Sequence, residues 1–197
     1  MKPYHFFIFL FSISIGQAQN INYNNFGSAI EVQSNGTPIS GGFVAVGTIN
    51  DPKSYTNKEL LESSFLQFGE STNFGGLTAL FIDGFFNGVA VGDIGSQFKY
   101  KRIFLIGGDR PSISKSETIF IIDTGKDFDD TPDFAESVDL NSGTILMGQL
   151  SGQPVAAGVA GAFQALPFGE ENTPPSVDGQ SVSVDEDGAV SITLEGR

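Results

Sequence analysis

Ile103-Phe104-Leu105-Ile106 and Ile119-Phe120-Ile121-Ile122 are the two stretches that decide the fold. Both are apolar at every position and rich in β-branched and aromatic residues, a composition that favours strands. Strands of this kind are buried on both faces, so each stretch is predicted to be a central strand of a sheet. Short strands separated by turns, in a chain with 25 Gly, predict an all-β protein with a β-sandwich or jelly-roll architecture.

Further strands are predicted before these two. Asn35-Gly36 favours the positive φ angles of a type I′ turn, so the flanking segments Ala29–Val32 and Thr37–Ser40 are predicted to form a hairpin. A longer strand follows over Phe43–Ile49, in which apolar residues alternate between the two faces.

The segment between Phe81 and Val91 contains two turn dipeptides, Asp83-Gly84 and Asn87-Gly88, and both are predicted to be turns. Ser142–Leu150 and Ala160–Leu166 are weaker strand patterns near the end of the domain.

One helix is predicted among the strands. Thr56 and Glu59 have the spacing of a capping box, in which each side chain accepts a hydrogen bond from the other residue's main chain. Gly69 is suited to end the helix in a left-handed conformation. The apolar face consists of Leu61, Phe65 and Phe68. Glu59 and Glu62 are interpreted as part of a solvated helix face and not as an acid–base pair.

The first 18 residues have the pattern of a signal peptide. Lys2 precedes a ten-residue apolar run over 6–15, and Gly16-Gln17-Ala18 provides the small residues that signal peptidase requires. Cleavage after Ala18 removes Lys2 and His5 and leaves nine basic residues against 23 acidic ones, a net charge of −14. We therefore expect an exported bacterial protein, secreted or at the cell surface.

The charge and the missing residue types exclude several function classes. A strongly acidic chain is unsuited to nucleic acid or anionic lipid, so a nucleic-acid partner is not expected. No segment after the first 18 residues is long and apolar enough to span a membrane, so membrane insertion of the mature chain is not expected either. The sequence has no Cys, and the processed chain would have no His, so the usual thiol and Ser–His nucleophiles are missing. A glycosidase that uses two carboxylates stays open.

The last part of the chain differs in composition from the rest. Pro174-Pro175 stiffens a linker, after which Val182 and Val184, and then Val190, Ile192 and Leu194, alternate with polar residues as in half-buried strands. The predicted organisation is a signal peptide (1–18), a β-rich domain (19–168), a linker (169–176) and an incomplete repeat (177–197).

The last part of the chain resembles a known family. Asn172-Thr173-Pro174-Pro175, followed by the segments 180–188 and 189–196, resembles the start of a bacterial cadherin-like (tandem Ig-like) repeat. The resemblance implies an Ig-like fold for this segment, a place in an array on a surface or secreted protein, and Ca²⁺ near the joints. Ser28–Gly47 is loosely similar to secreted bacterial proteins that end in a sorting signal, which implies a location only.

Two acidic clusters are candidate Ca²⁺ sites, because the ion prefers six to eight oxygen ligands on loops. The linker cluster consists of Glu170, Glu171 and Asn172, with Asp185, Glu186 and Asp187 as further ligands. The second cluster consists of Asp127, Asp129, Asp130 and Asp133. This second cluster is not an EF-hand, because Pro132 and Val138 occupy the positions that need Gly and Glu. An ordinary solvated acidic turn is the alternative there.

These observations favour a function by binding. The preferred interpretation is a non-catalytic extracellular module of a larger surface or secreted protein, with a role in adhesion or matrix interaction through a protein or glycan ligand. The alternative is a carbohydrate-binding module accessory to a downstream glycan-active enzyme. Trp, which often stacks on sugars, is absent, and most of the 19 Phe fit core positions.

Overall fold

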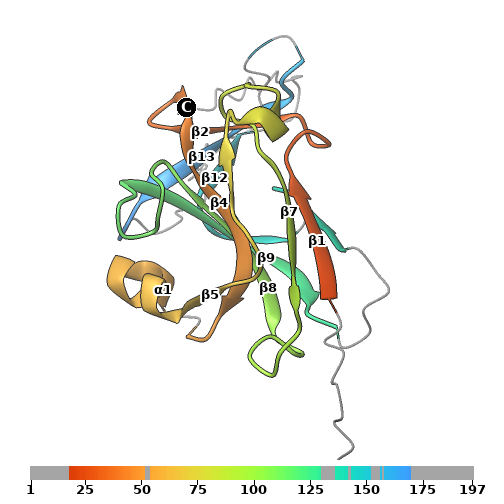
Figure 1. The fold of residues 1–197 in the computed structure, drawn as a ribbon. Coiled ribbons are helices and arrows are strands. Elements are labelled where there is room, and N and C mark those ends of the chain that lie inside the picture. Colours follow the sequence, from red (N-terminus) through yellow and green to blue (C-terminus); the bar gives the residue numbers. More distant parts are fainter. Residues whose placement is uncertain are drawn as a thin grey trace, which may run out of the picture.

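The computed structural model describes residues 18–51, 54–129, 136–141, 143–151, 156 and 158–169 (Figure 1). Strands dominate these residues, and the fold is all-β and sandwich-like, as the sequence predicts. The strands are β1 (Ala18–Asn24), β2 (Ile30–Ser34), β3 (Thr37–Pro38), β4 (Gly41–Ile49), β5 (Phe65–Gln67), β6 (Thr72–Phe74), β7 (Asn87–Asp93), β8 (Arg102–Gly108), β9 (Thr118–Asp127), β10 (Glu136–Val138), β11 (Thr144–Met147), β12 (Gln149–Ser151) and β13 (Gly161–Pro167). The helical segments are η1 (Ser54–Thr56), α1 (Lys58–Ser64) and η2 (Leu77–Ala79).

The strands form a large and a small sheet. The large sheet has the order β3-β2-β13-β9-β8-β4-β5, with β6 paired to β4, β11 to β9 and β12 to β13. The small sheet has the order β10-β1-β7. The two all-apolar stretches form β8 and β9 in the middle of the large sheet, which confirms their prediction as central strands. The large sheet is mixed, because β13 and β2 run parallel.

The large sheet is buried on both faces. On one face, Val44, Val46 and neighbouring side chains pack against the small sheet and form the main core. On the other face, Phe43 and Ala45 belong to a second cluster that also contains Leu61 of α1. Figure 1 shows β1 and β7 on one side of the large sheet and α1 on the other. This double coverage explains why β4, β8 and β9 are apolar at consecutive positions.

Phe120 is the aromatic centre of the main core. Its ring lies 5.5 Å from that of Phe163 and 6.4 Å from those of Phe74 and Phe86, centroid to centroid. All four side chains are fully buried. Gly107 makes room for this cluster, because a Cβ at that position would lie 2.4 Å from the Phe120 ring. The cluster anchors β6 through Phe74, and β6 carries part of the site described below.

The hairpin prediction is confirmed, whereas the predicted helix ends are wrong. Asn35 and Gly36 both have positive φ, 51° and 76°, and join β2 to β3. The helix cap is Asn57, whose side chain accepts a hydrogen bond from the Leu60 amide, and not Thr56. The helix stops at Ser64, because the following residues pair with β4 as strand β5. Phe65 and Phe68 therefore lie beyond the helix.

Asn87-Gly88, predicted to be a turn, lies instead inside β7. Gly88 is paired with Tyr23 of β1, and a Cβ on Gly88 would lie 2.4 Å from the Tyr23 ring. This glycine therefore makes room for an aromatic ring across the strand pair. Asp83-Gly84 does lie in a turn, with Gly84 at φ 76°, and the weaker strand patterns correspond to β11, β12 and β13.

Candidate functional site

The candidate functional site is a pocket of about 450 Å³ that is open to solvent. Its size leaves room for a small ligand that stays partly exposed to solvent. Three separate parts of the chain form it: the start of β4, the segment around β6 and η2, and the loop between β8 and β9. The lining residues are Gly42, Phe43, Ser71, Thr72, Asn73, Leu77, Thr78 and Pro111.

Strands β4 and β6 build one wall of the pocket. Gly42 has a φ of 66°, and a Cβ on it would lie 2.2 Å from the carbonyl oxygen of Gly108, so only glycine fits there. β6 pairs with β4 with an irregular register between Gly41 and Val44. Phe74 of β6 is buried in the main core, whereas its neighbour Asn73 is exposed, as strand alternation requires. Burial of the Phe74 ring thus places the Asn73 side chain on the solvent side of β6.

Hydrogen bonds fix the two threonines of the pocket. The Thr72 hydroxyl donates to the carbonyl oxygen of Asn87 at 3.0 Å, and its oxygen lies 3.4 Å from the Thr78 hydroxyl. The Asn87 amide donates to the carbonyl oxygen of Thr78 at 3.3 Å. These bonds join β6 and η2 to the start of β7. The segment therefore has a defined shape although it lies at the surface.

Two polar side chains of the pocket are available to a ligand. Within the described part of the chain, the Asn73 amide and the Ser71 hydroxyl make no hydrogen bond with another residue. The Asn73 side chain lies over Gly76, where a Cβ would be 2.5 Å from its Oδ1. Both groups donate and accept hydrogen bonds, so they suit a partner that also does both.

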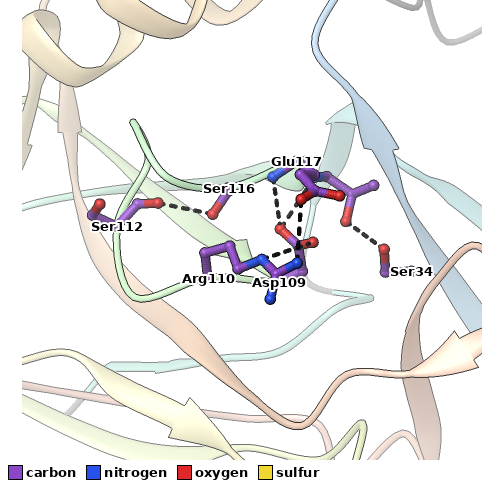
Figure 2. Close-up of polar contacts among 7 residues, drawn as sticks. Ser34, Asp109, Arg110, Ser112, Ser116 and Glu117 are labelled. Atoms are coloured by element: carbon purple, nitrogen blue, oxygen red, sulfur yellow. Dashed lines mark hydrogen bonds and ion pairs between the residues drawn. The ribbon is translucent and has the colours of Figure 1, made fainter.

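The loop between β8 and β9 is held by polar contacts (Figure 2). Asp109 Oδ1 accepts hydrogen bonds from the amides of Glu117 and Thr118 at 2.9 and 3.1 Å. Arg110 lies 4.0 Å from Asp109 Oδ2 and 3.2 Å from Glu117 Oε1, so its charge is compensated. These contacts hold the ends of the loop together and thereby place Pro111 at the pocket.

The serines near this loop have structural contacts. The Ser116 hydroxyl donates to the carbonyl oxygen of Ser112 at 2.8 Å, and Ser34 accepts a hydrogen bond from Thr118 at 2.8 Å (Figure 2). A main-chain carbonyl does not take up the proton of an attacking hydroxyl, as the general base of a serine nucleophile must. The contacts of this cluster therefore brace the loop.

The strongest surface feature is an apolar loop, residues 76–82, which continues from the pocket. Leu77, Leu80, Phe81 and Ile82 are 75%, 69%, 72% and 45% exposed. Leu80 and Phe81 have φ of 54° and 58°, a left-handed conformation that is strained for large side chains. Leu77 also lines the pocket, so the loop and the pocket form one surface.

The backbone of the apolar loop is nevertheless well defined. The Phe81 amide donates to the carbonyl oxygen of Gly76, and the Ile82 amide donates to that of Ala79, both at 3.0 Å. Ala79 is fully buried and anchors the centre of the loop. The large apolar side chains are thus presented outward by a hydrogen-bonded backbone.

Two residues of the predicted Ca²⁺ sites lie within the described chain. Asp127 forms an ion pair with Arg102 at 3.2 Å, and Arg102 also contacts Asp123 at 3.4 Å. Asp129 lies on the other side of Phe128, which is fully buried. Among the residues that the structure describes, no three His, Cys, Asp or Glu side chains are grouped as metal ligands. Outside the described residues lie Asp130, Asp133, Glu170, Glu171, Asn172, Asp185, Glu186 and Asp187.

Sequence reasoning missed the pocket and the apolar loop. The run from Leu77 to Ile82 has the composition of a buried strand, and nothing in its spacing shows that it is exposed. Gly75-Gly76 before it and Asp83-Gly84 after it were the only local indication that the run is a loop between two turns.

No family model, no curated protein and no solved structure matches this chain. Of the helices in the described part of the chain, none has the length and hydrophobicity that crossing a membrane requires. The function is therefore inferred from the chemistry of the pocket and the apolar loop.

Proposed function

We propose that the chain is a non-catalytic extracellular binding module of a larger surface or secreted protein, with a role in adhesion or matrix interaction. The observation that carries the proposal is the apolar loop, which exposes Leu77, Leu80, Phe81 and Ile82 next to an open pocket. Grouped exposed apolar side chains usually mark a binding surface. Backbone strain also tends to collect at functional sites.

The energetics support binding through this loop. Covering a large apolar side chain contributes about 1.5–3 kcal/mol when it becomes fully buried. No charged residue occurs from Gly75 to Ile82, so a partner would not have to desolvate a charge within the loop. Four such side chains are enough to form the apolar centre of an interface.

A non-catalytic role is supported by the chemistry available. A chain cleaved after Ala18 would contain neither His nor Cys, the commonest bases and nucleophiles. Ser34 and Ser116 are engaged in contacts that brace the β8–β9 loop. The Ser71 hydroxyl and the Asn73 amide, which have no hydrogen-bond partner among the residues that the structure describes, are suited to hydrogen bonding with a ligand.

Adhesion of the full chain to defined surfaces tests the proposal. Beads coated with the exported chain would be applied to immobilised collagen, fibronectin, cellulose, chitin and β-glucan. We expect retention on at least one surface and an at least tenfold loss, worth about 1.4 kcal/mol, for Leu80→Ser/Phe81→Ser.

Leu60→Ser is the matched control, because Leu60 is 54% exposed on α1 and lies outside the apolar loop. Retention of the control at the wild-type level supports the proposal. Equal retention of all three proteins, or no retention on any surface, would overturn it.

The carbohydrate-binding alternative is favoured by one specific observation, the uncharged hydroxyl and amide lining of the pocket. Calcium stabilisation at the linker remains a further part of the proposal. It rests on Glu170, Glu171 and Asn172 and on the acidic residues 185–187 of the sequence.

A further inference from the structure

We infer that the pocket beside the apolar loop binds an uncharged saccharide unit, and that Asn73 and Ser71 provide its polar contacts. The inference rests on the proposed function, because it names the class of ligand for the same surface.

The lining favours a ligand without charge. The side chains around the pocket are hydroxyl, amide or apolar, and none of them is ionisable. Arg110, next to Pro111 in the sequence, is compensated by Asp109 and Glu117. A charged ligand would gain no counter-ion from this lining, whereas an uncharged ligand needs none.

The hydroxyl and amide groups of the pocket match sugar hydroxyls. A hydroxyl both donates and accepts a hydrogen bond, and so do the Asn73 amide and the Ser71 hydroxyl. Leu77 and Pro111 provide apolar surface on which the C–H face of a sugar ring packs. The pocket thus offers polar and apolar surface at once, as a saccharide does.

A peptide is a poorer match. Peptides that bind as added strands need a strand edge with unpaired main-chain groups. β4, which forms a wall of the pocket, is paired with β8 on one edge and with β5 and β6 on the other. On β4, the main-chain groups without a regular partner on that edge are confined to the short stretch between Gly41 and Val44, where the pairing with β6 shifts, and this stretch is too short for an added peptide strand. The open shape of the pocket instead suits one unit of a chain that continues into solvent.

The test compares neutral and acidic oligosaccharides on the full exported chain. The neutral probes are cello-, manno- and laminari-oligosaccharides, and the acidic probe is oligogalacturonate, each titrated by calorimetry. We expect at least one neutral probe to bind and oligogalacturonate to bind at least tenfold more weakly.

Asn73→Asp keeps the size of the side chain but replaces an amide donor with a charge, so we expect at least a tenfold loss for the neutral probe. Asn20→Asp is the matched control, because it makes the same change in net charge at an exposed position of β1, outside the pocket. Equal melting temperatures of the two variants would show that both are folded. Wild-type affinity of the control supports the inference.

Three outcomes would overturn the inference: no neutral probe binds, oligogalacturonate binds as well as the neutral probes, or Asn73→Asp keeps the wild-type affinity. Failure here is distinguishable from failure of the proposed function. If Leu80→Ser/Phe81→Ser still abolishes surface retention while no oligosaccharide binds, the binding module stands and the saccharide assignment falls.

Discussion

The phenolic hydroxyl of Tyr23 donates a hydrogen bond to the carbonyl oxygen of Glu70 at 2.9 Å. Tyr23 belongs to β1 of the small sheet, whereas Glu70 lies between β5 and β6 of the large sheet. The bond therefore joins the two sheets just before the pocket residue Ser71. Burial of the ring raises the pKa of Tyr23 to about 12.

This pKa predicts a loss of stability at alkaline pH. The neutral phenol is favoured in the folded state, so the folded chain retains the Tyr23 proton above pH 10, where the unfolded chain releases it. The contribution of Tyr23 is complete below pH 10 and is lost as the pH rises through about 12. We expect the free energy of unfolding to fall by about 2 kcal/mol across this window, measured by denaturant titration.

Tyr23→Phe provides the comparison for this prediction. The variant loses one hydrogen bond, about 1 kcal/mol, at neutral pH, but it should no longer show the alkaline slope due to this residue. A variant with the same slope as the wild type would contradict the prediction. Tyrosinate absorbance provides a second readout. Because Tyr55 and Tyr100 remain in both proteins, the difference between the two absorbance titrations reports the ionisation of Tyr23.

The central strands could be predicted from the sequence, but β1 could not. β8 and β9 carry their signal locally, as unbroken apolar runs. β1 has Asn at positions 20, 22 and 24, and Asn is disfavoured in strands. Its strand conformation comes from pairing with β7 and β10, and from the burial of Ile21 and Tyr23. Tertiary pairing thus outweighs local preference.

The candidate site could not be predicted for a related reason. Its residues come from β4, from the segment between Ser71 and Thr78, and from Pro111, and only strand pairing brings these together. The apolar loop also has the composition of a core strand. Its exposure depends on the left-handed backbone at Leu80 and Phe81, which no local pattern of apolar residues indicates.

The helix cap differs between prediction and structure, because the sequence predicts Thr56 as the cap whereas the structure has Asn57 there. The Asn57 side chain accepts a hydrogen bond from the Leu60 amide at 2.9 Å, so Asn57→Ala should lower the free energy of unfolding by about 1 kcal/mol. Asn57→Ser is the matched control, because serine also caps helices well and should cost much less. Denaturant titration of the three proteins measures both differences. Equal losses in the two variants would contradict the role of Asn57 as the cap.

Calcium is predicted to stabilise the full chain through its acidic clusters. At a Ca²⁺ concentration of about 100 times Kd, the ion would add about 2.7 kcal/mol and raise the melting temperature relative to a sample with chelator. Glu170→Gln/Glu171→Gln should remove the increase if the ion is bound at the linker. Asp127→Asn/Asp129→Asn should remove the increase in melting temperature if the ion is bound at the second cluster. In the structure, Asp127 of that cluster pairs with Arg102. An unchanged midpoint in the wild type contradicts both sites.

The strained apolar loop predicts opposite effects of one substitution on stability and binding. Leu80 and Phe81 are held at positive φ, which costs a large side chain about 1–2 kcal/mol relative to a residue that tolerates this conformation. Asn tolerates it better, so Leu80→Asn/Phe81→Asn should raise the free energy of unfolding by about 0.5–1 kcal/mol. Both side chains are mostly exposed, so little packing energy is lost.

The same variant should bind at least tenfold more weakly to the immobilised material that retains the wild-type beads, because it lacks two of the four apolar side chains of the loop. Denaturant titration and bead retention measure the two effects on one protein. Leu60→Asn is the control, since it removes an exposed leucine from α1, where a helical position offers no relief of strain. A variant that is less stable than the wild type would show that the loop is not strained. A variant that is more stable and still binds normally would show that the exposed side chains are not the binding surface.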